Sequence, residues 1–303
     1  LRPDVITMDV HMPKIDGVEA TRRIMQTDPR PIVIVSGSSA FGEVSQAFAA
    51  LEAGALAALP RPEGLGHEGH ERSARELVQT VKAMAEVKLV RRWPRREPGA
   101  APALAREPGG GPPVVAIGAS TGGPPALHEI LAALPAGFPA AVLIVQHIAP
   151  GFVQGFAEWL AQSCSLRVGV ARHGEPIAGG RVYIAPDGHQ MAVAAGGKIV
   201  LTPCPGNAAL CPSVSHLFAS VARVYGHRAV AGLLSGMGRD GADELRLMKD
   251  CGAATFAQDK ESSTVHGMPG EAIRLGAARY VLPPEGIAPV LVALMGSGAR
   301  EQS

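Results

Sequence analysis

The sequence has few aromatic and few charged residues. Aromatic residues make up 4% of the 303 residues and charged residues 18%, whereas 47% are hydrophobic. The formal net charge is +1, so no overall electric field draws the chain to nucleic acid or to a membrane surface. No apolar run reaches the roughly 20 residues that cross a bilayer, and the first residues lack the charged and apolar blocks of a signal peptide. These absences predict a packed cytoplasmic protein that does not bind nucleic acid.

Cysteines and metal-ligand patterns are scarce as well. The four cysteines form no C-x-x-C pair and no zinc spacing: Cys164, Cys204, Cys211 and Cys251. We therefore expect reduced thiols rather than a disulfide framework. The segment His67-Glu68-Gly69-His70-Glu71 lacks the i, i+4 histidine pair of a zinc helix. We predict no metal site in the chain.

Strands and helices alternate along the first 88 residues. Apolar runs at 4–10, 31–36 and 55–59 read as strands, and amphipathic stretches at 18–28, 42–53 and 73–87 read as helices. Alternation at this spacing indicates βαβ units and a parallel sheet. A segment rich in proline, glycine and arginine follows at 89–113, and its composition predicts a solvated linker between two domains.

Residues 114–298 predict a second α/β domain, with a doubly wound parallel sheet. Its expected strands lie at 114–118, 140–146, 167–171, 181–185, 229–235, 254–258 and 279–282. Its expected helices lie at 124–134, 151–163, 213–225, 240–251, 268–275 and 287–294. A small antiparallel hairpin at 189–203 is expected on the edge of the sheet.

Three polar loops of the second domain each follow an apolar run. They contain Gly118-Ala119-Ser120-Thr121-Gly122-Gly123, then His147, and then Gly236-Met237-Gly238-Arg239-Asp240-Gly241. Loops that follow the carboxyl ends of parallel strands meet at one crevice. Ser120, His147 and Asp240 are therefore expected to meet there, and these side chains are the components of a nucleophilic hydrolase.

Other interpretations of these residues stay open at this point. The pattern Gly118-x-Ser120-x-Gly122 fits a nucleophile elbow, and the helix after it is expected to offer N–H groups to an oxyanion. A dinucleotide fingerprint would need glycine in place of Ser120 and an acidic residue about 20 positions later, where the chain has Gln146-His147. Ser120 and His147 could also be structural and Asp240 a helix cap, in a binding module without turnover.

Five motifs of the second domain resemble one known family in unbroken order over about 114–295. They are the Ser120 and Asp240 loops given above, Gln146-His147 with Pro150-Gly151-Phe152, Tyr183-Ile184-Ala185-Pro186, and Gly267-Met268-Pro269. They resemble the catalytic domain of the chemotaxis protein-glutamate methylesterases (CheB-type). The resemblance implies a serine hydrolase that removes methyl groups from γ-glutamyl methyl esters of chemoreceptors, releases methanol, and also deamidates receptor glutamines.

The resemblance also assigns roles to residues. It implies that Ser120 is the nucleophile, His147 the base, and Asp240 the acid that orients His147. Thr121 and Met237 would line the active site and its oxyanion site. No cofactor is implied for catalysis.

The first domain resembles a flavodoxin-like (CheY-like) response-regulator receiver. Asp9, followed by Met12-Pro13 and Asp16-Gly17, matches the phosphoacceptor, Ser36 the switch hydroxyl, and Arg61 stands where receivers have lysine. The resemblance implies the chemotaxis histidine kinase as phosphodonor, and a receiver that occludes the catalytic cleft until it is phosphorylated. The first receiver strands and their acidic pair are absent from the sequence, which makes Mg²⁺ binding doubtful.

Overall fold

The computed structural model describes residues 2–37, 41–87, 112–205 and 210–296. The chain forms two compact units, Leu1–Arg95 and Arg96–Ser303. The division falls within the segment for which the sequence predicts a linker, and nearly all of that segment, 89–113, lies outside the described residues. Within the described residues, no helix is both long and apolar enough to cross a membrane.

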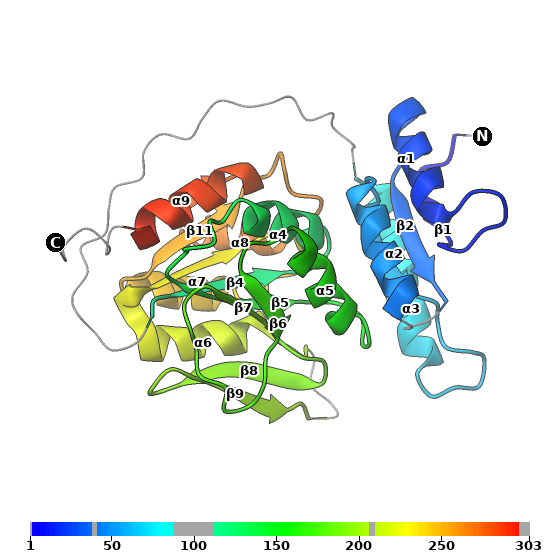
Figure 1. The fold of residues 1–303 in the computed structure, drawn as a ribbon. Helices are drawn as coiled ribbons and strands as arrows, with labels where there is room; N and C mark the ends of the chain where they lie inside the picture. Colours follow the sequence, from blue (N-terminus) through cyan, green and yellow to red (C-terminus); the bar gives the residue numbers. More distant parts are fainter. Residues whose placement is uncertain (1, 38–40, 88–111, 206–209, 297–303) are drawn as a thin grey trace. The chain divides into compact units, whose positions relative to one another are not determined.

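The first unit is a three-stranded parallel sheet with a helix after each strand (Figure 1). The strands pair in the order β1-β2-β3, and the central strand is almost entirely buried. The first helix begins at Asp16, whose side chain caps it by accepting the N–H of Glu19. The elements are β1 (Ile6–Met8), α1 (Gly17–Thr27), β2 (Ile32–Ser36), α2 (Phe41–Glu52), β3 (Ala57–Pro60) and α3 (His70–Ala85).

The second unit contains a parallel sheet of seven strands in the order β12-β11-β10-β4-β5-β7-β6. All the strands predicted for this domain are present and pair in parallel. The central strands are buried on both faces, which explains why they read as continuous apolar runs. The strands are β4 (Val114–Ala119), β5 (Ala141–Gln146), β6 (Arg167–Val170), β7 (Arg181–Ile184), β10 (Ala229–Leu233), β11 (Ala254–Gln258) and β12 (Tyr280–Leu282).

Helices cover both faces of this sheet, so the predicted doubly wound α/β fold is confirmed. On one face α4 packs against α5 and α9, and on the other α6 packs against α7, which in turn packs against α8 (Figure 1). The helices are α4 (Gly123–Ala132), α5 (Val153–Ser163), α6 (Val214–Tyr225), α7 (Ala242–Asp250), α8 (Met268–Arg274) and α9 (Pro284–Gly296).

The strand order places a switch point between β4 and β10. These two strands are neighbours, but the chain runs from β4 to β5 on one side and from β10 to β11 on the other. The carboxyl ends of β4 and β10 therefore mark the place where open α/β sheets bind their ligands.

The predicted antiparallel hairpin is present, but its expected place on the edge of the sheet is wrong. Strands β8 (His189–Ala194) and β9 (Lys198–Pro203) form a separate two-stranded sheet that packs on α6. The alternating pattern of β8 buries Met191 and Val193, and the backbone N–H of Val193 donates to the buried Ser220 hydroxyl of α6. Because one face of the hairpin is apolar, covering a helix buries more surface than pairing with a sheet edge.

The expectation of four reduced thiols is also wrong. Cys204 and Cys211 form a disulfide, with their Cα atoms 6.2 Å apart, in the connection between β9 and α6. That separation lies within the usual range for a disulfide. Sequence spacing could not show that Cys204 and Cys211 lie close together. Cys164 and Cys251 are free thiols, as expected.

Candidate active site

Ser120 lies in a tight turn between β4 and α4, at the carboxyl end of the sheet. Its backbone N–H donates to the carbonyl of Ser235 at 3.0 Å, and its carbonyl accepts the N–H of Gly123 at 2.8 Å. Gly122 has a φ of 79°, and a Cβ added there would lie 2.5 Å from Cβ of Thr264. The turn therefore needs glycine. Within the described residues the Ser120 hydroxyl has no hydrogen-bond partner, so it is available to a substrate.

His147 directly follows β5, the strand that pairs with β4. Its backbone N–H donates to the carbonyl of Ala119 at 2.9 Å, so the parallel ladder extends to the residue just before Ser120. The histidine is thus placed beside the Ser120 turn by strand pairing alone. Its side chain is 17% exposed.

Asp240 lies in the loop after β10 and contacts His147, which follows β5. Its Oδ2 is 2.9 Å from Nε2 of His147, and its side chain is 6% exposed. Its Oδ1 accepts the hydroxyl of Ser213 at 2.9 Å. His147 and Asp240 are 93 positions apart in the sequence, but they meet because β5 and β10 lie on either side of β4.

The first turn of α6 also binds the Asp240 carboxylate. The N–H of Val214 donates to Oδ2 at 2.7 Å and the N–H of Ser215 to Oδ1 at 3.0 Å. These two donors belong to a helix N-terminus, whose partial positive charge favours an anion. Burial by itself would raise the pKa of Asp240, but the hydrogen bonds from His147 and from the two backbone groups outweigh it, so the pKa lies well below its usual value. Asp240 is therefore an anion at neutral pH.

The ionised carboxylate fixes the tautomer of His147. A carboxylate can only accept hydrogen bonds, so the ring hydrogen of neutral His147 is on Nε2, facing Asp240. The lone pair is then on Nδ1, and this nitrogen is left to accept a proton. The sequence predicts that His147 and Asp240 pair, but not which nitrogen of His147 faces Asp240 and which accepts the serine proton.

Free backbone N–H groups lie in the Ser120 turn and in the loop of Met237. Within the described residues those of Thr121 and Met237 donate to no acceptor, whereas the carbonyl of Thr121 accepts the Ser235 hydroxyl at 2.7 Å. Met237 follows Gly236, where an added Cβ would lie 2.8 Å from Cβ of Ser120. The Met237 side chain is 52% exposed. The loop of Met237 therefore abuts the serine turn.

The N-terminus of α4 offers fewer donors than the sequence analysis expects. The N–H of Gly123 is bonded to the carbonyl of Ser120. The next two residues, Pro124 and Pro125, have no N–H at all. Any oxyanion at this turn must therefore use the free groups before the helix rather than the helix itself.

The sequence analysis missed the serines that support the site. Ser213 and Ser215 precede or open α6, and only the packing of α6 brings them to Asp240. The hydroxyl of Ser235 accepts the N–H of Val265 at 2.9 Å, which holds the loop before α8 against the serine turn. A serine at the end of an apolar strand is the one sequence signal that could have indicated Ser235.

In the first unit, the structure brings the three receiver residues together. Nη2 of Arg61 lies 2.6 Å from Oδ2 of Asp9, at the ends of β3 and β1. The N–H of Arg61 donates to the carbonyl of Ser36 at 2.7 Å, and Ser36 is buried at the end of β2. Oδ1 of Asp9 accepts the N–H of His11 at 3.3 Å.

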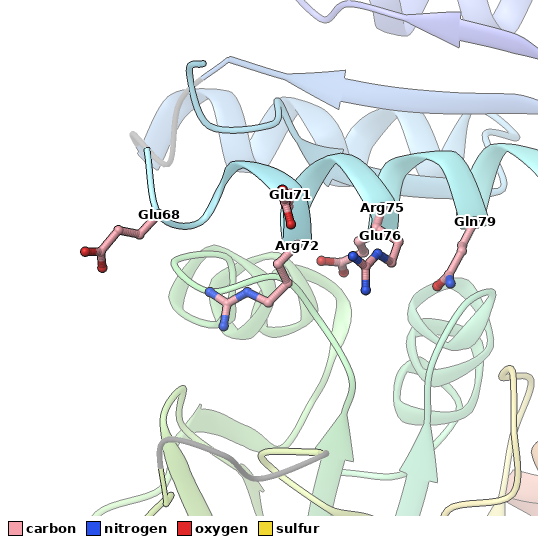
Figure 2. A pocket seen from close by; sticks show the side chains of 6 residues that line it. All are labelled: Glu68, Glu71, Arg72, Arg75, Glu76 and Gln79. Atoms are coloured by element: carbon pink, nitrogen blue, oxygen red, sulfur yellow. The ribbon is translucent and has the colours of Figure 1, made fainter. Parts of the chain in front are cut away.

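The other feature of the first unit is a charged face of α3 (Figure 2). Acidic and basic side chains are mixed along it and just before it, and none of them is a predicted site residue: Glu68, Glu71, Arg72, Arg75, Glu76 and Gln79. Opposite charges one turn apart on a helix stabilise it modestly. This arrangement is typical of a charge-balanced helix surface.

The geometry of the second unit is that of a known class of site. A serine on a tight strand–helix turn, a histidine at the neighbouring strand end and a carboxylate bonded to that histidine form the arrangement on which serine hydrolases are built. The order serine, histidine, aspartate differs from the order serine, acid, histidine of α/β-hydrolases.

Comparison with known proteins identifies the family. The model of the CheB methylesterase family matches residues 115–291, and that of the response regulator receiver domain matches residues 1–67. The chain therefore belongs to the CheB methylesterase family and carries a receiver domain. It is 59% identical to a protein-glutamate methylesterase/protein-glutamine glutaminase of Nitrosospira multiformis over 97% of this chain and 84% of that protein. It is 55% identical to one of Syntrophus aciditrophicus over 99% of this chain and 87% of that protein.

A solved structure shows the same fold. The crystal structure of the CheB methylesterase catalytic domain of Thermotoga maritima is 37% identical and aligns with a TM-score of 0.58, over 60% of this chain and 98% of that domain.

Proposed function

We propose that Ser120, His147 and Asp240 are the catalytic residues with which this chain acts as a protein-glutamate methylesterase. It hydrolyses γ-glutamyl methyl esters of chemoreceptors, releases methanol, and deamidates receptor glutamines by the same chemistry, in chemotaxis adaptation. The observation that carries the assignment is the hydrogen bond of 2.9 Å between His147 and the ionised Asp240, beside the Ser120 turn.

The reaction proceeds in two steps. Oγ of Ser120 attacks the ester carbonyl while Nδ1 of His147 takes the hydroxyl proton. The tetrahedral oxyanion accepts hydrogen bonds from the N–H groups of Thr121 and Met237, a role that their lack of another acceptor within the described residues supports. The intermediate collapses, and methanol leaves with the proton from His147. Water then attacks the acyl-enzyme with the help of His147, and the receptor carboxylate leaves.

Asp240 acts on charge and orientation rather than on the proton itself. Its depressed pKa keeps it ionised while His147 becomes an imidazolium, and the negative charge stabilises that cation. The hydrogen bonds from α6 fix the position of Asp240. The carboxylate and the histidine ring therefore need not reorganise during the reaction. We propose that catalysis needs no cofactor, since the chain itself supplies each group.

Regulation is assigned to the receiver. The partners are methylated chemoreceptors and a chemotaxis histidine kinase, and the chain works in the cytoplasm with access to the membrane through receptors only. We assign Asp9 to the phosphoacceptor position of the receiver, and Arg61 and Ser36 to its switch positions. The supporting observation is the ion pair between Arg61 and Asp9.

The described receiver residues do not fit Mg²⁺, the ion that the receiver fold implies. Within residues 2–37 and 41–87, no group of three or more metal-ligating side chains gathers, and Arg61 engages one oxygen of Asp9. We expect no Mg²⁺-dependent uptake of phosphate from acetyl phosphate by the chain of 303 residues. Uptake that requires Mg²⁺ and disappears in Asp9→Asn would contradict this expectation.

The decisive experiment measures methanol release from methylated chemoreceptor membranes. Ser120→Ala and His147→Ala are each expected to lower the rate on the order of 10⁴-fold or more while the chain stays folded. Ser165→Ala, an exposed serine outside the site, is the matched control and should release methanol like the unaltered chain. Substantial turnover by Ser120→Ala would remove the assignment of the nucleophile.

A further inference from the structure

Two buried glutamines end the strands on either side of the β4–β10 pair. Gln146 is the last residue of β5, next to β4, and Gln258 is the last residue of β11, next to β10. They are 3% and 1% exposed. A polar side chain at the last position of an otherwise apolar buried strand needs hydrogen-bond partners, and both amides find them in the loops around the crevice.

The amide of Gln146 joins the two loops that carry Ser120 and His147. Its Nε2 donates to the carbonyl of Ser120 at 2.8 Å and to the carbonyl of His147 at 2.8 Å. Both hydrogens of the amide are therefore used, one on each residue. Within the part of the chain that the structure describes, its Oε1 is buried without a hydrogen-bond partner, and it lies against Gly123 at the start of α4.

We infer that Gln146 is a positioning residue that fixes the separation of the nucleophile and the base. This inference rests on the proposed roles of Ser120 and His147. Besides Gln146, the hydrogen bond from His147 to the carbonyl of Ala119 links these two segments. That bond sets the strand register, whereas the Gln146 amide holds the carbonyl groups of the two reacting residues themselves.

Like Gln146, Gln258 is a buried amide at the end of a strand, but its hydrogen bonds join different groups. Its Oε1 accepts the N–H of Ser235 at 2.8 Å, and its Nε2 donates to the carbonyl of Ser262 at 2.9 Å. It bonds to neither Ser120 nor His147. Gln258→Met therefore removes a buried amide at a strand end that reaches the serine turn only indirectly, through Ser235, and it controls for the loss of the direct bonds to Ser120 and His147.

The test uses the full chain with two substitutions of nearly equal size, Gln146→Met and Gln146→Glu. Three quantities are measured at several pH values: the rate at which a fluorophosphonate labels Ser120, kcat and KM for methanol release, and the thermal midpoint of unfolding. Gln146→Met removes both donors, and we expect kcat to fall on the order of 10²-fold with little change in KM, as for a small misplacement of reacting groups. Gln258→Met should lose much less of either rate.

Gln146→Glu supplies a signature that a packing role would not give. A protonated carboxyl can still donate one hydrogen bond, whereas the ionised form can donate none and faces two carbonyl oxygens. Burial raises the pKa of a carboxyl introduced here. Labelling of Ser120 in Gln146→Glu, relative to the unaltered chain at the same pH, should therefore fall as pH rises. This variant also keeps the test valid if Gln146→Met does not fold.

The outcomes separate this inference from the proposed function. If the unaltered chain labels Ser120 and releases methanol but both Gln146 variants do so at the same rates, Gln146 is not a positioning residue. The same conclusion holds if Gln258→Met loses as much activity, or if the losses only follow the fall in thermal midpoint. If the unaltered chain itself is neither labelled nor active, the proposed function fails, and this inference fails with it.

Discussion

At the scale of single residues, Asp240 joins stability to catalysis. Its two oxygens accept four hydrogen bonds, from His147, Ser213, Val214 and Ser215. Two of these satisfy backbone groups that would otherwise be unpaired at the start of α6. The carboxylate that orients His147 therefore also accepts the backbone N–H groups at the start of α6, which would otherwise lack an acceptor.

The first prediction follows from the depressed pKa of Asp240. A carboxyl whose pKa is lower in the folded than in the unfolded chain stabilises the fold. This contribution is fully present at pH values above the unfolded pKa, usually 3.8, and is lost as the pH falls through the folded pKa. We expect Asp240→Asn to lower the free energy of unfolding by about 2 kcal/mol at neutral pH, since hydrogen bonds to a charged group are lost.

Urea unfolding of both chains over a pH series measures this difference. The difference should be constant from neutral pH down to the usual carboxyl range and shrink on further acidification, because protonated aspartic acid resembles asparagine. A difference that stays the same at the most acidic pH at which both chains fold would contradict the lowered pKa.

At the scale of elements, strand ends could be predicted from sequence and the helix that supports them could not. Apolar runs locate β4, β5 and β10, so Ser120, His147 and Asp240 could be assigned to one crevice by a general rule of parallel sheets. The contact of α6 with Asp240 depends on the path from β9 to α6. No periodicity records that path, so Ser213 and Ser215 were missed.

The two expectations that failed have the same cause: the sequence pattern does not show how segments of the chain pack together. Alternation in β8 predicts a strand with one apolar face but not whether that face covers a sheet edge or a helix. The disulfide between Cys204 and Cys211 depends on how their connection folds. In contrast, the shortage of donors at α4 could have been predicted, because Pro124 and Pro125 are visible in the sequence.

The second prediction concerns the turn between β4 and α4. Gly122 and Gly174 have nearly equal φ angles of 79° and 76°, but an added Cβ meets Thr264 and Ser235 at Gly122 and nothing within 4 Å at Gly174. Gly174→Ala should therefore cost only the backbone strain, about 1 kcal/mol. Gly122→Ala should cost about 2 kcal/mol more, since the serine turn must move away from the loop before α8.

Unfolding in urea compares the two variants, and labelling of Ser120 reports the turn itself. We expect Gly122→Ala to lose labelling and Gly174→Ala to keep it. Equal costs in stability together with equal labelling would show that the turn tolerates a side chain and that the crowding at Gly122 has no consequence.

At the scale of the whole molecule, the second unit contains every group that the proposed reaction uses. A hydrophobic core cluster of buried residues extends from Val114 to Ala277 and includes no residue of the first unit. Ser120, His147, Asp240 and Gln146 all belong to the same seven-stranded sheet and its loops. The receiver is therefore expected to control the reaction without contributing a group to it.

The last prediction is that residues 112–303 fold and release methanol without the first unit. A buried sheet covered by helices on both faces gives this fragment its own core, so it should unfold cooperatively in urea. Its rate on methylated receptor membranes should exceed that of the full chain if the unphosphorylated receiver inhibits, as the resemblance to chemotaxis methylesterases implies. The fragment with Ser120→Ala is the control for contaminating esterase. An equal rate would mean that the receiver does not inhibit in this chain, whereas a folded but inactive fragment would mean that the first unit supplies part of the site after all.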